Sequence, residues 1–395
     1  MPSRSSTGQV TSLAAIAALA ALGIVGNLAA YIIPIIVGSL ITSGLSAREA
    51  GFVEVADMTG LAIGAFTWSR VIQGVNWKTA ACCAIPLVVA GNLLCSMVSS
   101  LSMLMAGRVL SGLGSGLLLA IGNSGLAMTR NPDRTMGIVS VVSMSSSAVF
   151  LYVFTFLSHT GGMPYLFRGV ALLTCTLFLA AFWLPQRSPI ENATAKNGAT
   201  TATADRIPWF EGSLALAGIS GFFIAALVFW TYVERVAVSA GFSTAFIARS
   251  LFIAQLSGAA GALLTAVVTT RFGGRLVPMS GYITVAIGAA LILASGPESW
   301  PFVVAACMLN FAWSGIYPFF IGTIITLDPS ARLIGLTLTT QTASKALAPA
   351  IAGLLVTGTH YANAYYFAAV CFAISLALLL KPVLLADKPR KSAVC

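Results

Sequence analysis

The segment GRVLSGLGSG at residues 107–116 lies within a predominantly apolar run over 101–127. A helix of roughly 20 apolar residues crosses a hydrocarbon core about 30 Å thick, so this run is long enough to span a bilayer. Gly112 and Gly116 are four residues apart and allow another helix to approach closely. Arg108 places a charge inside the same run. The segment therefore predicts a membrane-spanning helix that packs tightly and carries a buried cation.

The composition extends this prediction to the whole chain. Of 395 residues, 58% are hydrophobic and 8% are charged, whereas soluble domains contain about 25% charged residues. The mean hydropathy of +0.93 excludes a soluble globular fold. The formal charge of +10 has a topological explanation, because the Lys and Arg residues lie mainly in short loops between apolar runs. We therefore expect a lipid bilayer, and no nucleic acid, as the chain's surroundings.

Apolar runs of spanning length recur along the chain, and twelve of them predict an all-α membrane protein. They cover residues 13 to 38, 49 to 69, 79 to 99, 101 to 127, 137 to 157, 165 to 184, 212 to 233, 247 to 268, 277 to 295, 301 to 326, 333 to 357 and 362 to 385.

Loop charges and a polar segment predict the topology. Most of the 21 Lys and Arg residues fall on the side of the N-terminus, so both termini are expected in the cytoplasm. Residues 186–208 are rich in Ala, Thr, Ser and Asn and form the predicted linker between bundles at 1–185 and 209–395. Short loops and the lack of targeting features favour a bacterial inner membrane, in which we expect a monomer.

The two halves repeat one plan. Residues 44–46 (GLS) precede a span that carries Gly60, and residues 241–243 (GFS) precede a span that carries Gly258. Parallel six-helix repeats place a substrate site between them, near the middle of the membrane.

Three motifs carry a resemblance to the major facilitator superfamily. Residues 269–275 (TTRFGGR) resemble the loop signature D-R-x-G-R, and residues 107–116 are similar to the motif R-x-x-x-G-x-G. The turn at 131–134 (NPDR) is echoed by residues 328–332 (DPSAR). Residues 143–147 read SMSSS where drug-proton antiporters of this family carry G-P-x-x-G-G. The resemblance implies two pseudo-symmetric six-helix bundles, alternating access and a coupling role for Arg108.

Four charged residues fall well inside predicted spans, away from their ends: Glu54, Asp57, Arg108 and Lys345. Each such charge costs on the order of 2.5 to 3.5 kcal/mol at a helix centre, so it needs a partner or a function. Arg108 is expected to contact a carboxylate, carbonyl groups or an anionic substrate. Glu54 and Asp57 are the candidate proton carriers, since burial favours the uncharged carboxyl group.

Asp57 and Lys345 come from the second and eleventh spans, which the resemblance brings together at the central interface. We hypothesise that they approach each other in one state of the transport cycle. A permanent structural ion pair is the alternative. Glu234 and Arg235 end the seventh span and form either a gate or an interfacial pair.

Polar and aromatic residues near the middle of the spans are candidates to line a substrate cavity, although a single aromatic residue more often serves helix packing. The candidates are Asn27, Tyr31, Trp230, Gln255, Asn310, Trp313, Tyr317 and Gln341.

No Walker loop, metal-ligand spacing or nucleophile motif occurs in the sequence, so we expect no enzyme, cofactor or metal. The sequence predicts a secondary transporter, with protons as the coupling ion. Arg108 and Lys345 favour a small organic anion or zwitterion as the substrate. Proton-coupled efflux of a drug-like compound or secreted metabolite is the alternative, and a transporter-like sensor without turnover is more remote.

Overall fold

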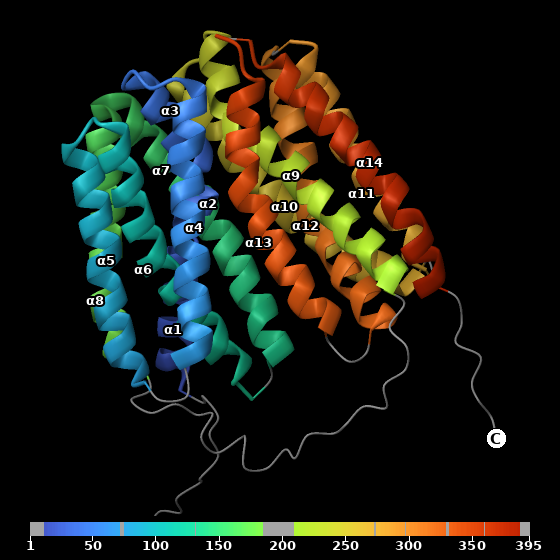
Figure 1. Ribbon diagram of the computed structural model, residues 1–395, viewed down its shortest axis with the longest axis horizontal. Helices are drawn as coiled ribbons and strands as arrows, with labels where there is room; N and C mark the ends of the chain where they lie inside the picture. The colour runs from blue at the N-terminus through green and yellow to red at the C-terminus, as the bar shows by residue number, and fades with distance from the viewer. Residues whose placement is uncertain are drawn as a thin grey trace, which may run out of the picture. The chain divides into compact units, whose positions relative to one another are not determined.

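The computed structural model describes residues 12–71, 75–130, 132–184, 209–271, 274–296, 298–328, 332–358 and 360–387. Its helices are connected by turns and fall into two compact units, Met1–Thr200 and Thr201–Cys395. The predicted linker at 186–208 lies outside the described residues. Figure 1 shows the helices of each unit running side by side along most of their length. Nine helices in the described part of the chain are long and apolar enough to cross a membrane, as expected of an all-α membrane protein.

The first unit contains α1 to α8, with the bounds Leu13–Gly26, Leu28–Tyr31, Ile33–Thr42, Ala47–Val71, Trp77–Met97, Leu101–Ala127, Pro132–Cys175 and Leu177–Ala181. The second unit contains α9 to α14, with the bounds Trp209–Ser239, Thr244–Arg271, Leu276–Ala294, Ser299–Leu327, Arg332–Leu355 and Ala362–Ala386.

The first predicted span, 13 to 38, differs from the structure. It consists of α1, α2 and α3, because the backbone leaves helical geometry at Asn27 (ψ 5°) and again at Ile32 (ψ 16°). Pro34 follows directly and has no N–H group, so it cannot close a helical hydrogen bond to the preceding turn. The expectation of one continuous helix was therefore wrong, and the segment continues to Thr42 in shorter pieces.

The fifth and sixth predicted spans lie within α7 and α8. The chain changes direction at Gly162, whose φ of 66° lies in the left-handed region that favours glycine. Gly44 and Gly241 adopt positive φ angles of 109° and 76° at equivalent points of the two units. These two glycines follow α3 and α9, so the repeated sequence pattern corresponds to a repeated turn.

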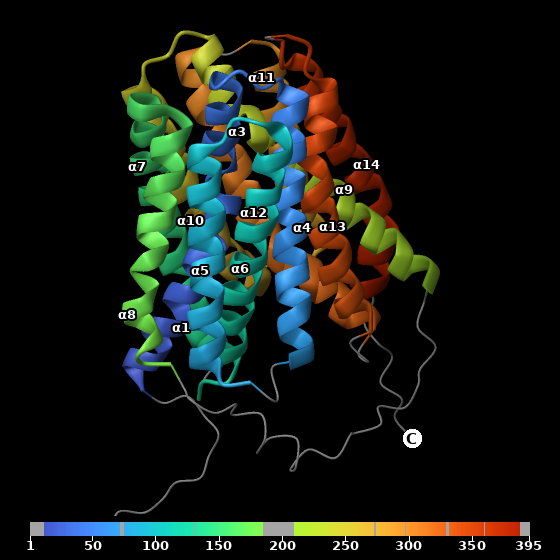
Figure 2. The ribbon, with the colours of Figure 1, turned by 60° about the vertical axis from the view of Figure 1, so that its left-hand side comes forward.

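Helix α6 is the central packing element of the first unit, and Figure 2 shows it alongside α4 and α5. A Cβ atom at Gly112 would collide with the carbonyl oxygen of Asp57, and one at Gly116 would collide with that of Leu61. A Cβ atom at Gly114 would lie 2.6 Å from the carbonyl oxygen of Ala84 on α5. The small residues of the 107–116 segment therefore bring α6 into direct backbone contact with both neighbours, as its spacing predicts.

In the second unit, α10, α11 and α12 are joined by a buried polar network. The Thr265 hydroxyl donates to the carbonyl oxygen of Gly315 at 2.6 Å and lies 2.8 Å from the Tyr282 hydroxyl. Tyr282 in turn donates to the carbonyl oxygen of Gly261 at 3.1 Å. These bonds satisfy polar groups away from water and fix the three helices against one another.

The start of α11 is held by an acid at the end of α14. The Asp387 carboxylate accepts hydrogen bonds from the backbone N–H groups of Arg275 (2.7 Å) and Leu276 (3.2 Å). The Arg275 guanidinium lies 3.7 Å from the same carboxylate and donates to Thr326 of α12 at 2.9 Å. We call these contacts the Arg275–Asp387 clasp. Arg275, which ends the predicted loop signature at 269–275, is thus part of a structural contact. Phe272 and Gly273 of that signature lie outside the described residues.

Replacing Gly112 by Ala should destabilise the protein, because the added methyl group forces α4 and α6 apart. We expect a loss of roughly 1 to 3 kcal/mol, visible as a lower midpoint of thermal unfolding in detergent. Gly137→Ala is the matched control, since nothing lies within 4 Å of a Cβ atom at Gly137 on α7. Equal midpoints for the two variants would contradict the close packing of α4 and α6.

Asp387→Ala should remove the cap of α11 and lower stability by about 0.5 to 2 kcal/mol in the same assay. Glu298→Ala is the control, because Glu298 precedes α12 without making a capping hydrogen bond. A control variant that loses as much stability as Asp387→Ala would show that the Arg275–Asp387 clasp adds nothing specific.

Candidate functional site

A buried ion pair joins α4 and α6 in the first unit. Asp57 Oδ2 lies 2.9 Å from Arg108 Nη2, and both side chains are about 1% exposed. Arg108 precedes Gly112 by one helical turn, and Gly112 contacts the backbone of Asp57. The close approach of the two helices therefore places the guanidinium beside the carboxylate. Of the partners expected for Arg108, the structure provides a carboxylate.

Helices α5 and α7 complete the surroundings of Arg108. Arg108 Nη1 donates to Asn92 Oδ1 at 3.3 Å, and Asn92 Nδ2 donates to Ser111 Oγ at 2.8 Å. The guanidinium carbon lies 5.4 Å from the centre of the Phe167 ring, within cation–π range. Sequence reasoning missed Asn92, although a polar amide inside the apolar run 79–99 was a usable signal. Nothing in the sequence pointed to Phe167.

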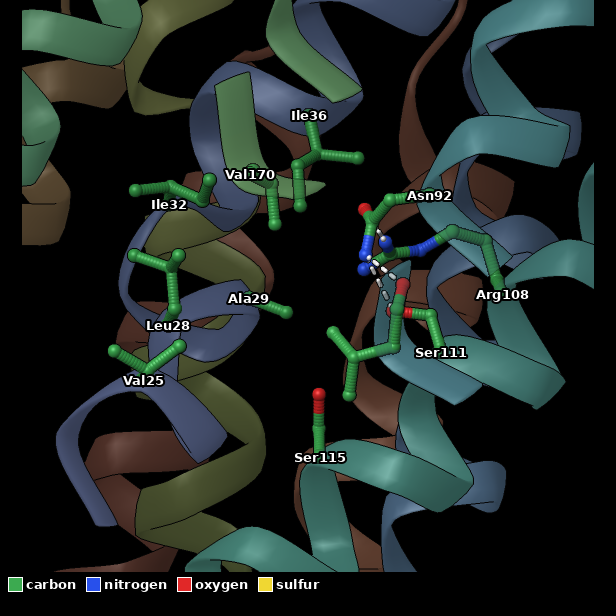
Figure 3. A pocket seen from close by; sticks show the side chains of 11 residues that line it. Val25, Leu28, Ala29, Ile32, Ile36, Asn92, Arg108, Ser111, Ser115 and Val170 are labelled. Carbon is green, nitrogen blue, oxygen red and sulfur yellow. Dashed lines mark hydrogen bonds between the residues drawn. The ribbon is translucent and has the colours of Figure 1, made fainter. Parts of the chain in front are cut away.

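A small pocket adjoins this network, as Figure 3 shows. Its polar wall carries Asn92, Arg108, Ser111 and Ser115, and the facing wall belongs to the broken first span. The volume of about 10 Å³ is close to what one water molecule requires. The apolar lining consists of Val25, Leu28, Ala29, Ile32, Ile36, Val88 and Val170.

Glu54 lies one helical turn from Asp57 on α4 and is 0% exposed. Neither of its carboxylate oxygens has a hydrogen-bond partner among the described residues. The two acids that the sequence singled out as proton carriers thus differ in their surroundings. Asp57 is paired with a cation, whereas Glu54 is buried without a donor.

In the second unit, a lysine lies over one ring of an aromatic cluster. Lys345 Nζ on α13 lies 5.1 Å from the centre of the Phe223 ring on α9. The same ring contacts Trp313 and Tyr317 of α12, with centroid distances of 5.8 and 6.4 Å. Tyr317 and Gln341 share a hydrogen bond. We call these five residues the Lys345 cluster; only Phe223 was missing from the sequence-based candidates.

The other candidates have more local surroundings. The Tyr31 hydroxyl lies 2.5 Å from that of Ser143 on α7, and Asn27 forms the break between α1 and α2. Asn310 Nδ2 donates to the carbonyl oxygen of Ala306 within its own helix. Trp230 is buried.

The predicted gate and the exchange pair remain predictions. Glu234 is 4% exposed, and Arg235 and Gln255 are half-buried. Asp57 and Lys345 belong to different units, and within the first unit Asp57 pairs with Arg108. Among the described residues, no group of three or more His, Cys, Asp or Glu side chains is arranged to hold a metal ion.

Asp57→Asn should leave Arg108 buried without a counter-charge. Removing one partner of a buried ion pair costs on the order of 3 to 5 kcal/mol, so the thermal unfolding midpoint in detergent should fall markedly. Adding Arg108→Met to this variant should restore much of the loss, because the second charge is then removed as well. Additive losses in the double variant would contradict the importance of this pair.

The comparison with known proteins agrees with this architecture. Two similar solved structures are a D-xylose-proton symporter and the nucleoside transporter NupG, each with a TM-score of 0.73 and 14% identity. The alignment with the symporter covers 94% of this chain and 97% of that chain, and the alignment with NupG covers 92% and 98%. A partially occluded inward-open structure of the xylose transporter XylE from E. coli has a TM-score of 0.72 at 14% identity, with 93% and 97% coverage. At this identity the likeness establishes the fold.

No curated protein matches the sequence. The sequence model of the Major Facilitator Superfamily matches residues 11–344, which is most of the chain. The motifs, the helical fold and this match lead to one conclusion: the chain belongs to the major facilitator superfamily and is an integral membrane transporter rather than an enzyme.

Proposed function

We propose that this transporter moves a small organic anion or zwitterion across the membrane by alternating access, driven by a proton gradient. The observation that carries the proposal is Lys345, a cation in an aromatic environment. Within the described part of the second unit, no carboxylate forms a salt bridge with its ammonium group. A bound anion would supply the missing negative charge.

Arg108, the other cation expected to recognise an anion, is a weaker candidate. Asp57 neutralises it, and Asn92 occupies one of its remaining donors. The cation–π contact between Lys345 and Phe223 stabilises an ammonium group only partly, by about 0.5 to 2 kcal/mol. Lys345 therefore keeps more of its capacity to bind a carboxylate than Arg108 does.

The other members of the Lys345 cluster fit the rest of such a substrate. Trp313 is partly exposed and Tyr317 is 37% exposed, so both rings retain surface that a substrate can cover. Binding sites for small molecules combine apolar and aromatic walls with few polar groups that fix orientation. Gln341 and Lys345 would fix a carboxylate, while the rings would cover an apolar body.

Proton coupling is supported by the two acids of the first unit. Glu54 and Asp57 lie inside a membrane-spanning helix, where ionisable residues mark ion pathways and proton relays. One of the similar structures is described as a proton symporter, which is consistent with this coupling in the same fold.

The test is a thermal-shift panel on detergent-purified protein with acetate, benzoate, glycine and tetraphenylphosphonium. A ligand that binds the folded state at 100 times its Kd stabilises it by about 2.7 kcal/mol. We expect stabilisation by a carboxylate or zwitterion that is lost in Lys345→Met. It should persist in Lys381→Met, because Lys381 is 61% exposed and pairs with Glu211 at 2.9 Å.

Other outcomes of the panel would overturn the proposal. Stabilisation by tetraphenylphosphonium alone, lost in Glu54→Gln, would favour efflux of lipophilic cations. Carboxylate binding that survives Lys345→Met would exclude Lys345 as the anchor. Saturable binding without counterflow in proteoliposomes would indicate a sensor rather than a transporter.

A further inference from the structure

Three ionisable side chains of the first unit share one buried environment: Glu54, Asp57 and Arg108. The charges of Asp57 and Arg108 balance each other across 2.9 Å. An ionised Glu54 would add a second negative charge to this environment, whereas a protonated Glu54 leaves it neutral. The net charge of the group therefore depends on the protonation state of Glu54.

The local contacts of the two acids separate their roles. Asp57 is held by a guanidinium, and losing its charge would leave Arg108 unpaired. Glu54 is 0% exposed, and its two oxygens accept no hydrogen bond from any described residue. An ionised carboxylate in such a place is costly, because burial without donors penalises the charged form strongly. Glu54 can gain or lose a proton without breaking an ion pair.

The helices packed against α4 supply few other charged or titratable groups. Helix α6 contributes Arg108, and α5, which packs on α6, contributes the Cys95 thiol near the same group. Helix α3 contacts α4 but contains no titratable side chain. On α4 itself, Arg48 and Glu49 lie in the first turn and Arg70 lies in the last. The Glu49 carboxylate accepts a hydrogen bond from the backbone N–H of Ser46 at 2.8 Å.

We propose that Glu54 is the proton-binding residue of the first unit, and that Asp57 and Arg108 remain an ionised pair that positions it. The use of this proton to drive substrate movement rests on the function proposed above. In this assignment Glu54, the unpaired acid, exchanges the proton. Asp57, the paired acid, positions Glu54 and does not share in proton exchange.

Infrared difference spectra of the full chain in lipid, recorded between about pH 5 and about pH 9, test this assignment over the range in which buried carboxyl groups titrate. A protonated carboxyl group has a carbonyl stretching band that carboxylates lack. We expect such a band in the wild type and its loss in Glu54→Gln, which keeps the shape of the protonated acid. Glu49→Gln is the matched control and should retain the band.

Isotope labelling distinguishes the two acids without any substitution of Asp57, which could prevent folding. Carbon-13 in the glutamate carboxyl groups should shift the band, whereas carbon-13 in the aspartate carboxyl groups should leave it in place. A band that survives Glu54→Gln, or that shifts with aspartate labelling, would overturn the assignment, as would the absence of any band in the wild type. These spectra require no substrate, so their outcome is independent of the thermal-shift panel.

Discussion

An isolated charge is costly inside a bilayer, and the Asp57–Arg108 ion pair meets this constraint in the first unit. The pair depends on backbone packing, because Gly112 lets α6 contact α4 beside Asp57. Asn92 and Phe167 then surround the guanidinium from α5 and α7. One electrostatic requirement thus links four helices, and their small residues make the required distance possible.

The surroundings of the cation inside the predicted spans differ between the two units. Arg108 has a carboxylate partner in its own unit, whereas Lys345 is covered by the Phe223 ring. A neutralised cation serves mainly to hold helices together, whereas a cation without a carboxylate retains affinity for an external anion. This difference is the basis for proposing proton binding in the first unit and substrate binding in the second.

Much of the fold was predictable from the sequence, because length and hydropathy define spans and small residues define close helix contacts. That Glu54, Asp57 and Arg108 lie inside packed helices was predictable for the same reason. Partner choice was not, since depth along a helix does not reveal which helices are neighbours or how each is rotated. The sequence did not single out the Asp57–Arg108 pairing that the first unit shows. The approach of Asp57 to Lys345 in one state of the transport cycle stays a prediction. Phe223 was not predictable as a site residue, because a phenylalanine in an apolar run cannot be distinguished from the other packing residues around it.

The Arg275–Asp387 clasp has a consequence for the order of events during synthesis. Its two residues are separated by 112 positions, with α11, α12, α13 and α14 between them. The first amide groups of α11 therefore lack this acceptor until α14 has been made and has packed in place. The second unit can complete the start of α11 only after its last helix has been inserted.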